Sequence, residues 1–364
     1  MSEAKEKIKI LDSVRAAATV AVFLFHAGYL LSYSWGGILQ PVRFVTFGGT
    51  VGVWIFFVLS GWLLFYQMHR GGEALTRQSL WRYARKRLLR ILPLYYFSLF
   101  FTVLFLRQDI LFAADGIRSI LYNLVFLRGI KGAGGGGTIS INPVYWTLVI
   151  EMHFYFLLPL FYYIFCRFRN FKPFLAVILF GVAYRVAVIT LGSSPSMQLL
   201  RFTPANFDFF ALGMLGAYLY VDRSRWLTYL TSKYIQVASI LFLLLFMRFY
   251  DLDFLPTWSY VLAPIFLGSI IALIILSFIL NDKTFLSGVF ASRPILFIGK
   301  ISYSIYIWHA MVIPRVETLT ISNSQKFLLN IIITLIVSTI SYYIIEAPFL
   351  RLKSRVKPVV NTVP

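Results

Sequence analysis

Cysteine and acidic side chains are both scarce in this chain of 364 residues. It has one cysteine, Cys166, so an intramolecular disulfide, a Cys-x-x-Cys motif and a cysteine-rich metal site are all excluded. Only 14 residues are Asp or Glu, and charged residues make up 13% of the sequence, about half the share typical of soluble domains. This shortage of charge excludes a disordered chain, a collagen-like repeat and an ordinary cytosolic enzyme.

Apolar residues stand where the charge is missing. They make up 59% of the chain, and its mean hydropathy is +0.77, so the excess has to lie against lipid. The remaining charge is biased, with 34 Lys and Arg and a net charge of +20. A nucleic-acid-binding protein could carry such a bias, but the basic cytoplasmic loops of a membrane protein explain it together with the hydropathy. We therefore expect a multi-pass integral membrane protein without a nucleic-acid partner.

Stretches long enough to cross a bilayer recur along the whole chain. A bilayer core of ~30 Å needs about 20 mostly apolar residues per helix. We expect an all-α bundle of about ten transmembrane helices in a single domain, residues 1–364, with no appended soluble domain. The expected spans are residues 12–33, 50–68, 91–107, 144–166, 173–191, 205–221, 234–250, 258–280, 294–313 and 327–346.

The positions of Lys and Arg predict the topology of this bundle. If the N-terminus is cytoplasmic, most Lys and Arg residues fall in cytoplasmic segments, as the positive-inside rule requires. Both termini are then cytoplasmic. The first span is not a cleavable signal peptide, because Arg15 and His26 interrupt it and no small-x-small site follows.

Arg15 and His26 are the ionisable residues of the first span. They are eleven residues apart, which is nearly three whole turns, so they share one helix face at a separation of ~16 Å. Ionisable residues within a span normally face the bundle interior and are functional candidates. Two structural alternatives remain open: Arg15 could snorkel to cytoplasmic headgroups, and His26 could be a core histidine bonded to a backbone carbonyl.

Other ionisable residues are expected at the depth of His26. Glu151 lies ~10 Å below the external surface, while His26 lies ~21 Å above the cytoplasmic side of a ~30 Å core. His309 reaches the same layer, and Asp208 lies slightly closer to the outside. Several ionisable groups at one depth indicate a polar reaction chamber, although bundle-stabilising hydrogen bonds would also explain Asp208 and His309.

A basic cluster is expected on the cytoplasmic side. Residues 82–93 read RYARKRLLRILP, and Arg87 and Arg90 share a face if the segment is helical. Arginine binds phosphate with two parallel hydrogen bonds. Retention of the loop in the cytoplasm and binding of anionic lipid would explain the cluster too. Together with Arg15, it also suits a soluble polyanionic donor such as a coenzyme A thioester.

Segments of the chain resemble, in order, those of the acyltransferase family 3 membrane proteins. The resemblance covers about residues 10–352. The family's first-helix signature, a basic residue and a histidine with ten residues between them, is met by Arg15 and His26, and its Arg-x-x-Arg by Arg87 and Arg90. The matching segments are LDSVRAAATVAVFLFH (11–26), WIFFVLSGWLL (54–64), RLLRILPLYY (87–96), VYWTLVIEMHFYFLLPLF (144–161), FDFFALGML (207–215), ISYSIYIWH (301–309) and IEAPFLR (345–351).

The resemblance implies an O-acyltransferase of the bacterial inner membrane. Such proteins move an acyl group, most often acetyl, from cytoplasmic acyl-CoA to a hydroxyl of a surface carbohydrate or lipid-linked glycan, with no permanently bound cofactor and no metal. By resemblance, His26 is catalytic, and Arg15, Arg87 and Arg90 bind acyl-CoA. Glu151 falls on the acidic position of a Trp-Ser-Leu-type motif and is the second catalytic candidate. That motif departs from the family pattern here, reading Trp146-Thr147-Leu148 with Met152 and His153 where polar or acidic residues are usual.

Two chemical routes and one other function class stay open at this stage. His26 could deprotonate the acceptor hydroxyl or carry the acyl group transiently, and Glu151 would orient the imidazole if the two meet. Ten helices with buried ionisable residues would also suit a transporter or flippase of a glycan or small solute. No inverted repeat is visible, and the basic cluster lies at the cytoplasmic rim instead of the midplane.

Overall fold

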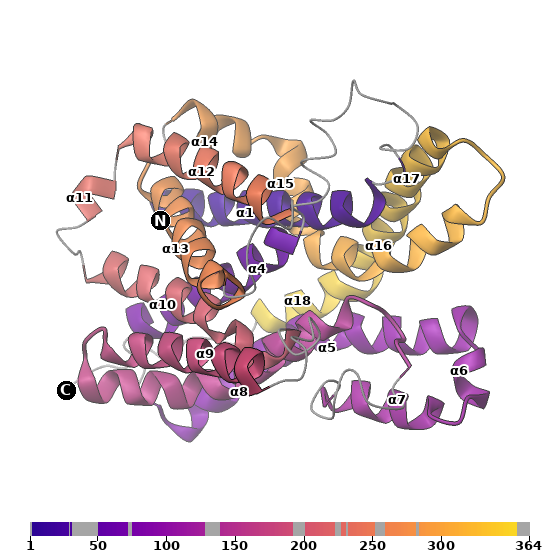
Figure 1. The fold of residues 1–364 in the computed structure, drawn as a ribbon, viewed down its shortest axis with the longest axis horizontal. Helices are drawn as coiled ribbons and strands as arrows, with labels where there is room; N and C mark the ends of the chain where they lie inside the picture. Colours follow the sequence, from indigo (N-terminus) through magenta and orange to yellow (C-terminus); the bar gives the residue numbers. More distant parts are fainter. Residues whose placement is uncertain are drawn as a thin grey trace.

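The computed structural model describes residues 2–28, 30, 50–71, 75–127, 139–191, 201–222, 227–230, 232–251, 259–281 and 284–354. Every regular element within these ranges is helical, which confirms the all-α prediction for the described part of the chain. Figure 1 shows the helices gathered into one bundle, with the short helices α6 (Asp109–Phe112) and α7 (Gly116–Leu124) at its edge.

Nine of the ten expected spans overlap one long helix each, and the span 294–313 is divided between two helices, α15 (Arg293–Lys300) and α16 (Ser302–Glu317). Residues 29 and 31–33 of the first expected span, 12–33, lie outside the described residues. The long helices are α1 (Ser2–Ala27), α4 (Thr50–Gly71), α5 (Arg77–Phe101), α8 (Tyr145–Phe168), α9 (Lys172–Leu191), α10 (Phe207–Val221), α12 (Lys233–Asp251), α13 (Ser259–Leu280), α16 (Ser302–Glu317) and α17 (Asn323–Ser341). Short elements join or extend them: η2 (Thr102–Leu106), η4 (Thr203–Asn206), α11 (Leu227–Leu230), α14 (Phe285–Phe290), α15 (Arg293–Lys300), η5 (Tyr342–Glu346) and α18 (Ala347–Ser354).

The number of helices that cross the membrane is smaller by the criteria of length and hydropathy. Within the described residues, seven helical segments are long and apolar enough, or up to eight if α15 and α16 form one span bent by 72°. α10 has 15 residues, and the apolar part of α12, Lys233–Phe246, is also short. The count of ten and the cytoplasmic placement of both termini therefore stay predictions.

The third helix begins earlier than its expected span of 91–107. α5 starts at Arg77, where the side chain of Thr76 caps the helix by accepting a hydrogen bond from the backbone N–H of Ser79. Continuation into η2 extends this helical segment to Leu106. The hydropathy of the sequence marks only the apolar half, because the first turns are basic. Arg87 therefore lies ten residues, or ~15 Å, inside a continuous helix.

The centre of the bundle is built on a close approach of α4 and α10. A Cβ atom on Gly213 would collide with the backbone carbonyl of Val58, and one on Gly61 with that of Phe210. Small residues of this kind let two helix backbones pack closely in a membrane. Aromatic rings fill the space beside them, including Phe57, which stacks on Phe210 at 4.9 Å between ring centroids. α4 thus becomes a fixed wall for the site described next.

Candidate active site

A polar cavity of about 90 Å³ lies among α1, α4, α5, α8 and α16. It brings Arg15, Arg87, Arg90 and Glu151 together, although they are far apart in the sequence. Its lining combines three cationic side chains with one carboxylate. The other polar side chains in its lining are Ser60, Thr147, Tyr155, Ser302, Tyr303 and Tyr306.

A second cavity of about 90 Å³ adjoins Arg87 from the start of α5. Its lining also has three basic residues, Arg82, Lys86 and Arg87, but it has no acidic residue, whereas the first cavity has Glu151. The other side chains of its lining include Ser79 and Gln67. Arg87 lines both cavities. The cationic side chains of α5 therefore extend from the beginning of the helix to the inner cavity.

The three cavity arginines differ in how far their charge is neutralised. Arg15 Nη1 donates to Asp12 Oδ1 at 2.7 Å, and Arg90 Nη1 lies 3.5 Å from Glu346 Oε1. Arg87 Nη2 donates to the neutral amide oxygen of Gln67 at 2.8 Å, and its buried Nε–H has no partner in the described part of the chain. Of the three cavity arginines, Arg87 therefore has the least neutralised charge and a free N–H donor among the described residues, both of which favour binding of an anion.

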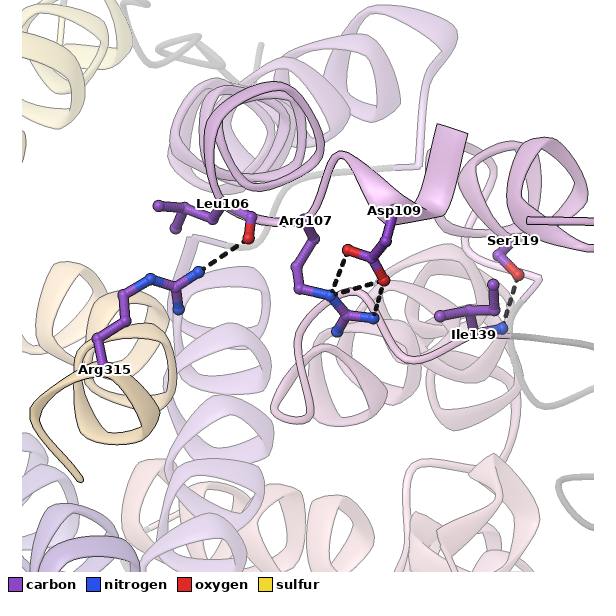
Figure 2. A network of polar contacts seen from close by, with 6 residues as sticks. All are labelled: Leu106, Arg107, Asp109, Ser119, Ile139 and Arg315. Carbon is purple, nitrogen blue, oxygen red and sulfur yellow. Dashed lines mark hydrogen bonds and ion pairs between the residues drawn. The ribbon is translucent and has the colours of Figure 1, made fainter. Parts of the chain in front are cut away.

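Other arginines, at the opposite end of α5, are already engaged (Figure 2). Arg107 donates to both carboxylate oxygens of Asp109 at 2.7–3.1 Å, and this hydrogen bonding lowers the pKa of Asp109. Arg315 donates to the backbone oxygens of Met311 and Leu106. These contacts set the two outer arginines apart from Arg87.

Glu151 lies with the arginines. Its Oε1 atom accepts hydrogen bonds from Ser60 Oγ at 2.9 Å and from the hydroxyl of Tyr155, one turn along α8. Within the residues that the structure describes, no hydrogen bond or ion pair joins Glu151 to His26. The contact between carboxylate and imidazole that a common depth permits is therefore not among the contacts of the described residues. Sequence position fixes the depth of a residue along its helix, but helix packing decides which neighbour it faces.

His26 instead meets His309. Their ring centroids are 5.0 Å apart, with the rings inclined at 63°. His26 Nδ1 lies 2.9 Å from the backbone oxygen of Val22, and His309 Nδ1 lies 3.1 Å from that of Ile305. Because a carbonyl oxygen only accepts, each neutral ring carries its proton on Nδ1 and leaves the lone pair on Nε2. The bond to a backbone carbonyl, the structural alternative for His26, is thus present and leaves a base available at Nε2.

Tyr306 links the polar cavity to the histidine pair. It lines the cavity, its hydroxyl group lies 2.6 Å from Thr147 Oγ1, and its ring centroid is 5.8 Å from that of His309. His309 follows Tyr306 by three residues, which is just under one turn of α16. The histidines therefore lie directly beyond the end of the cavity.

Asp208 has a different environment. Its Oδ2 atom accepts a hydrogen bond from Arg185 Nη2 at 2.7 Å, and both side chains are almost completely buried. Arg185 also donates to the backbone oxygens of Ala205 and Val261. This network ties α9 to the start of α10 and to α13, so the bundle-stabilising alternative fits Asp208.

One acidic residue of the site was not singled out from the sequence. Glu346 lies in η5, is 2% exposed, pairs with Arg90 and accepts a hydrogen bond from Ser304 Oγ at 3.0 Å. The rule that an ionisable residue in an apolar helix is a functional candidate would have found it. Glu346 was overlooked because it is the last residue of the expected span 327–346, and the segment around it was considered only for its resemblance to the family.

Comparisons with known proteins identify relatives of this chain by sequence but no similar solved structure. A family model described as an acyltransferase domain matches residues 8–347. The peptidoglycan O-acetyltransferase OatA of Listeria monocytogenes is 27% identical over 94% of this chain and 56% of its own length. A putative O-acetyltransferase of Staphylococcus aureus (strain COL) is 25% identical over 93% of this chain and 56% of its own. The putative peptidoglycan O-acetyltransferase YrhL of Bacillus subtilis is 26% identical over 93% and 54%, respectively. The chain thus spans a little over half the length of these relatives. No solved structure matches.

Proposed function

The chain belongs to the acyltransferase domain family, and from this premise we propose that it is a membrane O-acyltransferase. It moves an acyl group, most often acetyl, from cytoplasmic acyl-CoA to a hydroxyl of a cell-surface or lipid-linked carbohydrate. The observation that carries the proposal is the succession of an arginine-lined cavity, Tyr306 and a pair of histidines whose Nδ1 atoms face backbone oxygens, so that Nε2 carries the lone pair. A glycan transporter or flippase, the alternative from the sequence, gains no support from the family.

The donor end of the site is the basic start of α5. In this proposal, the phosphates of acyl-CoA bind in the second cavity, which is lined by Arg82, Lys86 and Arg87. Arg15 and Arg90 line the inner cavity, which receives the narrow pantetheine arm and its thioester. Glu151 lines the same cavity and is hydrogen-bonded to Ser60, and in this proposal its negative charge balances part of the charge of the arginines.

The chemical end is the histidine pair. In the direct route, His26 Nε2 takes the proton of the acceptor hydroxyl as its oxygen attacks the thioester carbon. The carbon–sulfur bond breaks, an ester bond forms, and the thiolate regains one proton. In the relay route, His26 Nε2 attacks the thioester and holds the acyl group, and the hydroxyl then attacks this acyl-histidine. His309, 5.0 Å away between ring centroids, supplies a second base for the hydroxyl proton in that step.

The relatives support a proposal for the acceptor and the location. Two of them are named for transfer to peptidoglycan, a cell-wall carbohydrate, and all are bacterial. We place this chain in the bacterial inner membrane, with the basic start of α5 in the cytoplasm, because acyl-CoA is a cytoplasmic compound. Its acceptor is a carbohydrate on the other side.

An experiment on purified protein in nanodiscs tests this function. The protein is incubated with radiolabelled acetyl-CoA, with and without cell-wall glycan fragments or lipid-linked glycan precursors. The proposal predicts CoA release and label on the glycan. If glycan is never labelled and acetyl-CoA is neither bound nor cleaved, the chain uses another donor or transports its solute unchanged.

A further inference from the structure

One face of α17 buries polar side chains that the reaction described above does not use. Asn330, Thr334 and Ser338 are spaced four residues apart, and Ser341 follows one turn later, so all four share one side of the helix. Each is 5% exposed or less. The amide nitrogen and oxygen of Asn330 and all three hydroxyl oxygens lack a hydrogen-bond partner within the described residues. We call these four residues the polar face of α17.

The outer part of this face lies level with the histidine pair. α16 and α17 pack side by side as an antiparallel hairpin (Figure 1), and a capping box between Ser322 and Gln325 fixes the start of α17. His309 lies eight residues before the end of α16, and Asn330 lies seven residues after the start of α17. Measured along the axis of the hairpin, the two residues therefore lie within ~2 Å of the same height. The buried Nε2 of His309 also lacks a partner among the described residues.

Phe23 of α1 confirms this register. Its ring centroid is 6.5 Å from that of His309 and 6.5 Å from that of Phe327 on α17. Ile313 and Ile331 pack in the same cluster. α17 thus borders the environment of the two histidines.

The inner part of the face leads to the arginine-lined cavity. Ser341 is followed by η5, a π-helical turn whose backbone bonds join residues five apart, so Glu346 lies about one turn beyond it. Glu346 accepts from Ser304 and pairs with Arg90, which lines the cavity. Polar groups therefore follow one another from His309 to Arg90.

The spacing of these groups suits single water molecules. Steps of three or four residues along a helix are ~4.5–6 Å, and a water that bridges two polar groups spans two hydrogen bonds of ~2.8 Å each. A row of hydroxyl and amide groups that is dry and unpaired inside a membrane protein carries a desolvation penalty at every step. Ordered waters remove that penalty, since buried waters typically bind such groups.

We propose that the polar face of α17 holds a file of water molecules that carries the reaction's proton between the histidine pair and the Glu346–Arg90 end of the cavity. This inference rests on the proposed function. Acyl transfer from a thioester to a hydroxyl releases one proton from the hydroxyl oxygen and returns one proton to the thiolate sulfur. In the relay route these two events are separated: the thiolate takes a proton at the arginine end as CoA leaves, and the hydroxyl later releases its proton at the histidine pair, which replaces the one taken. While the donor fills the cavity, α17 offers that proton a separate path along ~16 Å of helix.

Cysteine labelling tests the presence of water without any need for activity. The only native cysteine, Cys166, is replaced by Ser, and Ser338→Cys is compared with Ile336→Cys on the lipid-facing side of the same helix. Thiols react with silver ions or methanethiosulfonates as thiolates, which form only in water. In nanodiscs, Ser338→Cys should react at least about tenfold faster than Ile336→Cys. Equal, very slow reaction at both positions would overturn the proposal.

Isosteric variants test proton transfer. Asn330→Leu and Thr334→Val keep the volume of the side chain but interrupt the file, while Ile336→Val is the matched control. We expect both polar variants to retain acetyl-CoA binding, to lose about tenfold or more in turnover, and to show a larger solvent deuterium isotope effect. Folded variants with normal turnover and an unchanged isotope effect would contradict the proposal. If the wild type itself transfers no acetyl group, the proposed function fails, whereas the labelling result still decides whether the face is hydrated.

Discussion

Arg87 differs from the other two cavity arginines because it has no ion pair with an acidic residue in the described part of the chain. Arg15 and Arg90 have carboxylate neighbours, while Arg87 bonds a neutral amide and keeps a buried N–H without a partner in the described residues. Its charge is therefore the least neutralised in the cavity. Arginine binds phosphate through a planar fork that lysine lacks.

We predict that Arg87→Gln raises the KM for acetyl-CoA by about 10- to 100-fold, the loss expected for one charge-assisted hydrogen bond. Arg87→Lys should give a smaller increase, because charge without the fork remains. Arg107→Gln is the control, since Arg107 is occupied by Asp109 at the other end of the helix. Steady-state kinetics of CoA release measure the effect, and an unchanged KM in Arg87→Gln would contradict the assignment of the donor site.

Asp208 is a structural residue in this account. Removing one partner of a buried ion pair leaves an uncompensated charge, so Asp208→Leu should cost about 3–5 kcal/mol of stability and lower the Tm. The double variant Arg185→Met with Asp208→Leu should recover most of that loss, because it removes both charges together. Thermal unfolding in nanodiscs measures the Tm of the single and the double variant. If Asp208→Leu kept its Tm but lost acetyl transfer, Asp208 would belong to the active site.

Single residues also show which features of the site can be predicted from the sequence. The apolar context and helix position of His26 and His309 predicted one common depth, and the structure brings their rings together. The same reasoning placed Glu151 at that depth, but its contacts are Ser60 and Tyr155. Depth follows from counting residues along a helix. The rotation of each helix depends on packing against neighbours, which one sequence does not reveal.

At the scale of helices, the close approach of α4 and α10 determines how the cavity is built. Ser60 and Phe56 line the cavity from α4, and the adjoining side of α4 packs against α10 through Gly61 and Gly213. A side chain inserted between the two backbones would push α4 toward the arginines.

We therefore predict that Gly213→Ala destabilises the protein by about 1–3 kcal/mol, the usual cost of overpacking. The added Cβ collides with the backbone oxygen of Val58, which cannot move away as a flexible side chain would. Gly288→Ala on α14 is the matched control, because nothing lies within 4 Å of a Cβ added there. The Tm of both variants in nanodiscs checks the prediction, and equal Tm values would show that α4 and α10 can separate freely.

The helices themselves were predictable from hydropathy, but their ends were less so. The basic first half of α5 escaped the expected span of 91–107, since a window of apolar residues cannot detect a charged helix start. The cap at Thr76 was the available signal. The 72° bend between α15 and α16 lies within one expected span, 294–313, because an apolar run gives no sign of a change in direction.

On the scale of the whole molecule, the structure arranges chemistry along one axis. Basic side chains of α5 occupy one end, the small cavity with Arg15 and Arg90 follows, and Tyr306 leads to His26 and His309. The eleven residues between Arg15 and His26 on α1 correspond to ~16 Å. A donor with a charged head and a long thin arm matches this arrangement, and a compact donor does not.

In the proposed reaction, His26 performs the chemistry on an acyl group delivered from the arginine end. The most direct test measures acetyl transfer from radiolabelled acetyl-CoA by His26→Ala beside the wild type, with acetyl-CoA binding measured on the same samples. We predict that binding is retained while transfer falls by at least about 100-fold, the usual contribution of a general base. Transfer at the wild-type rate by a folded His26→Ala variant would contradict it.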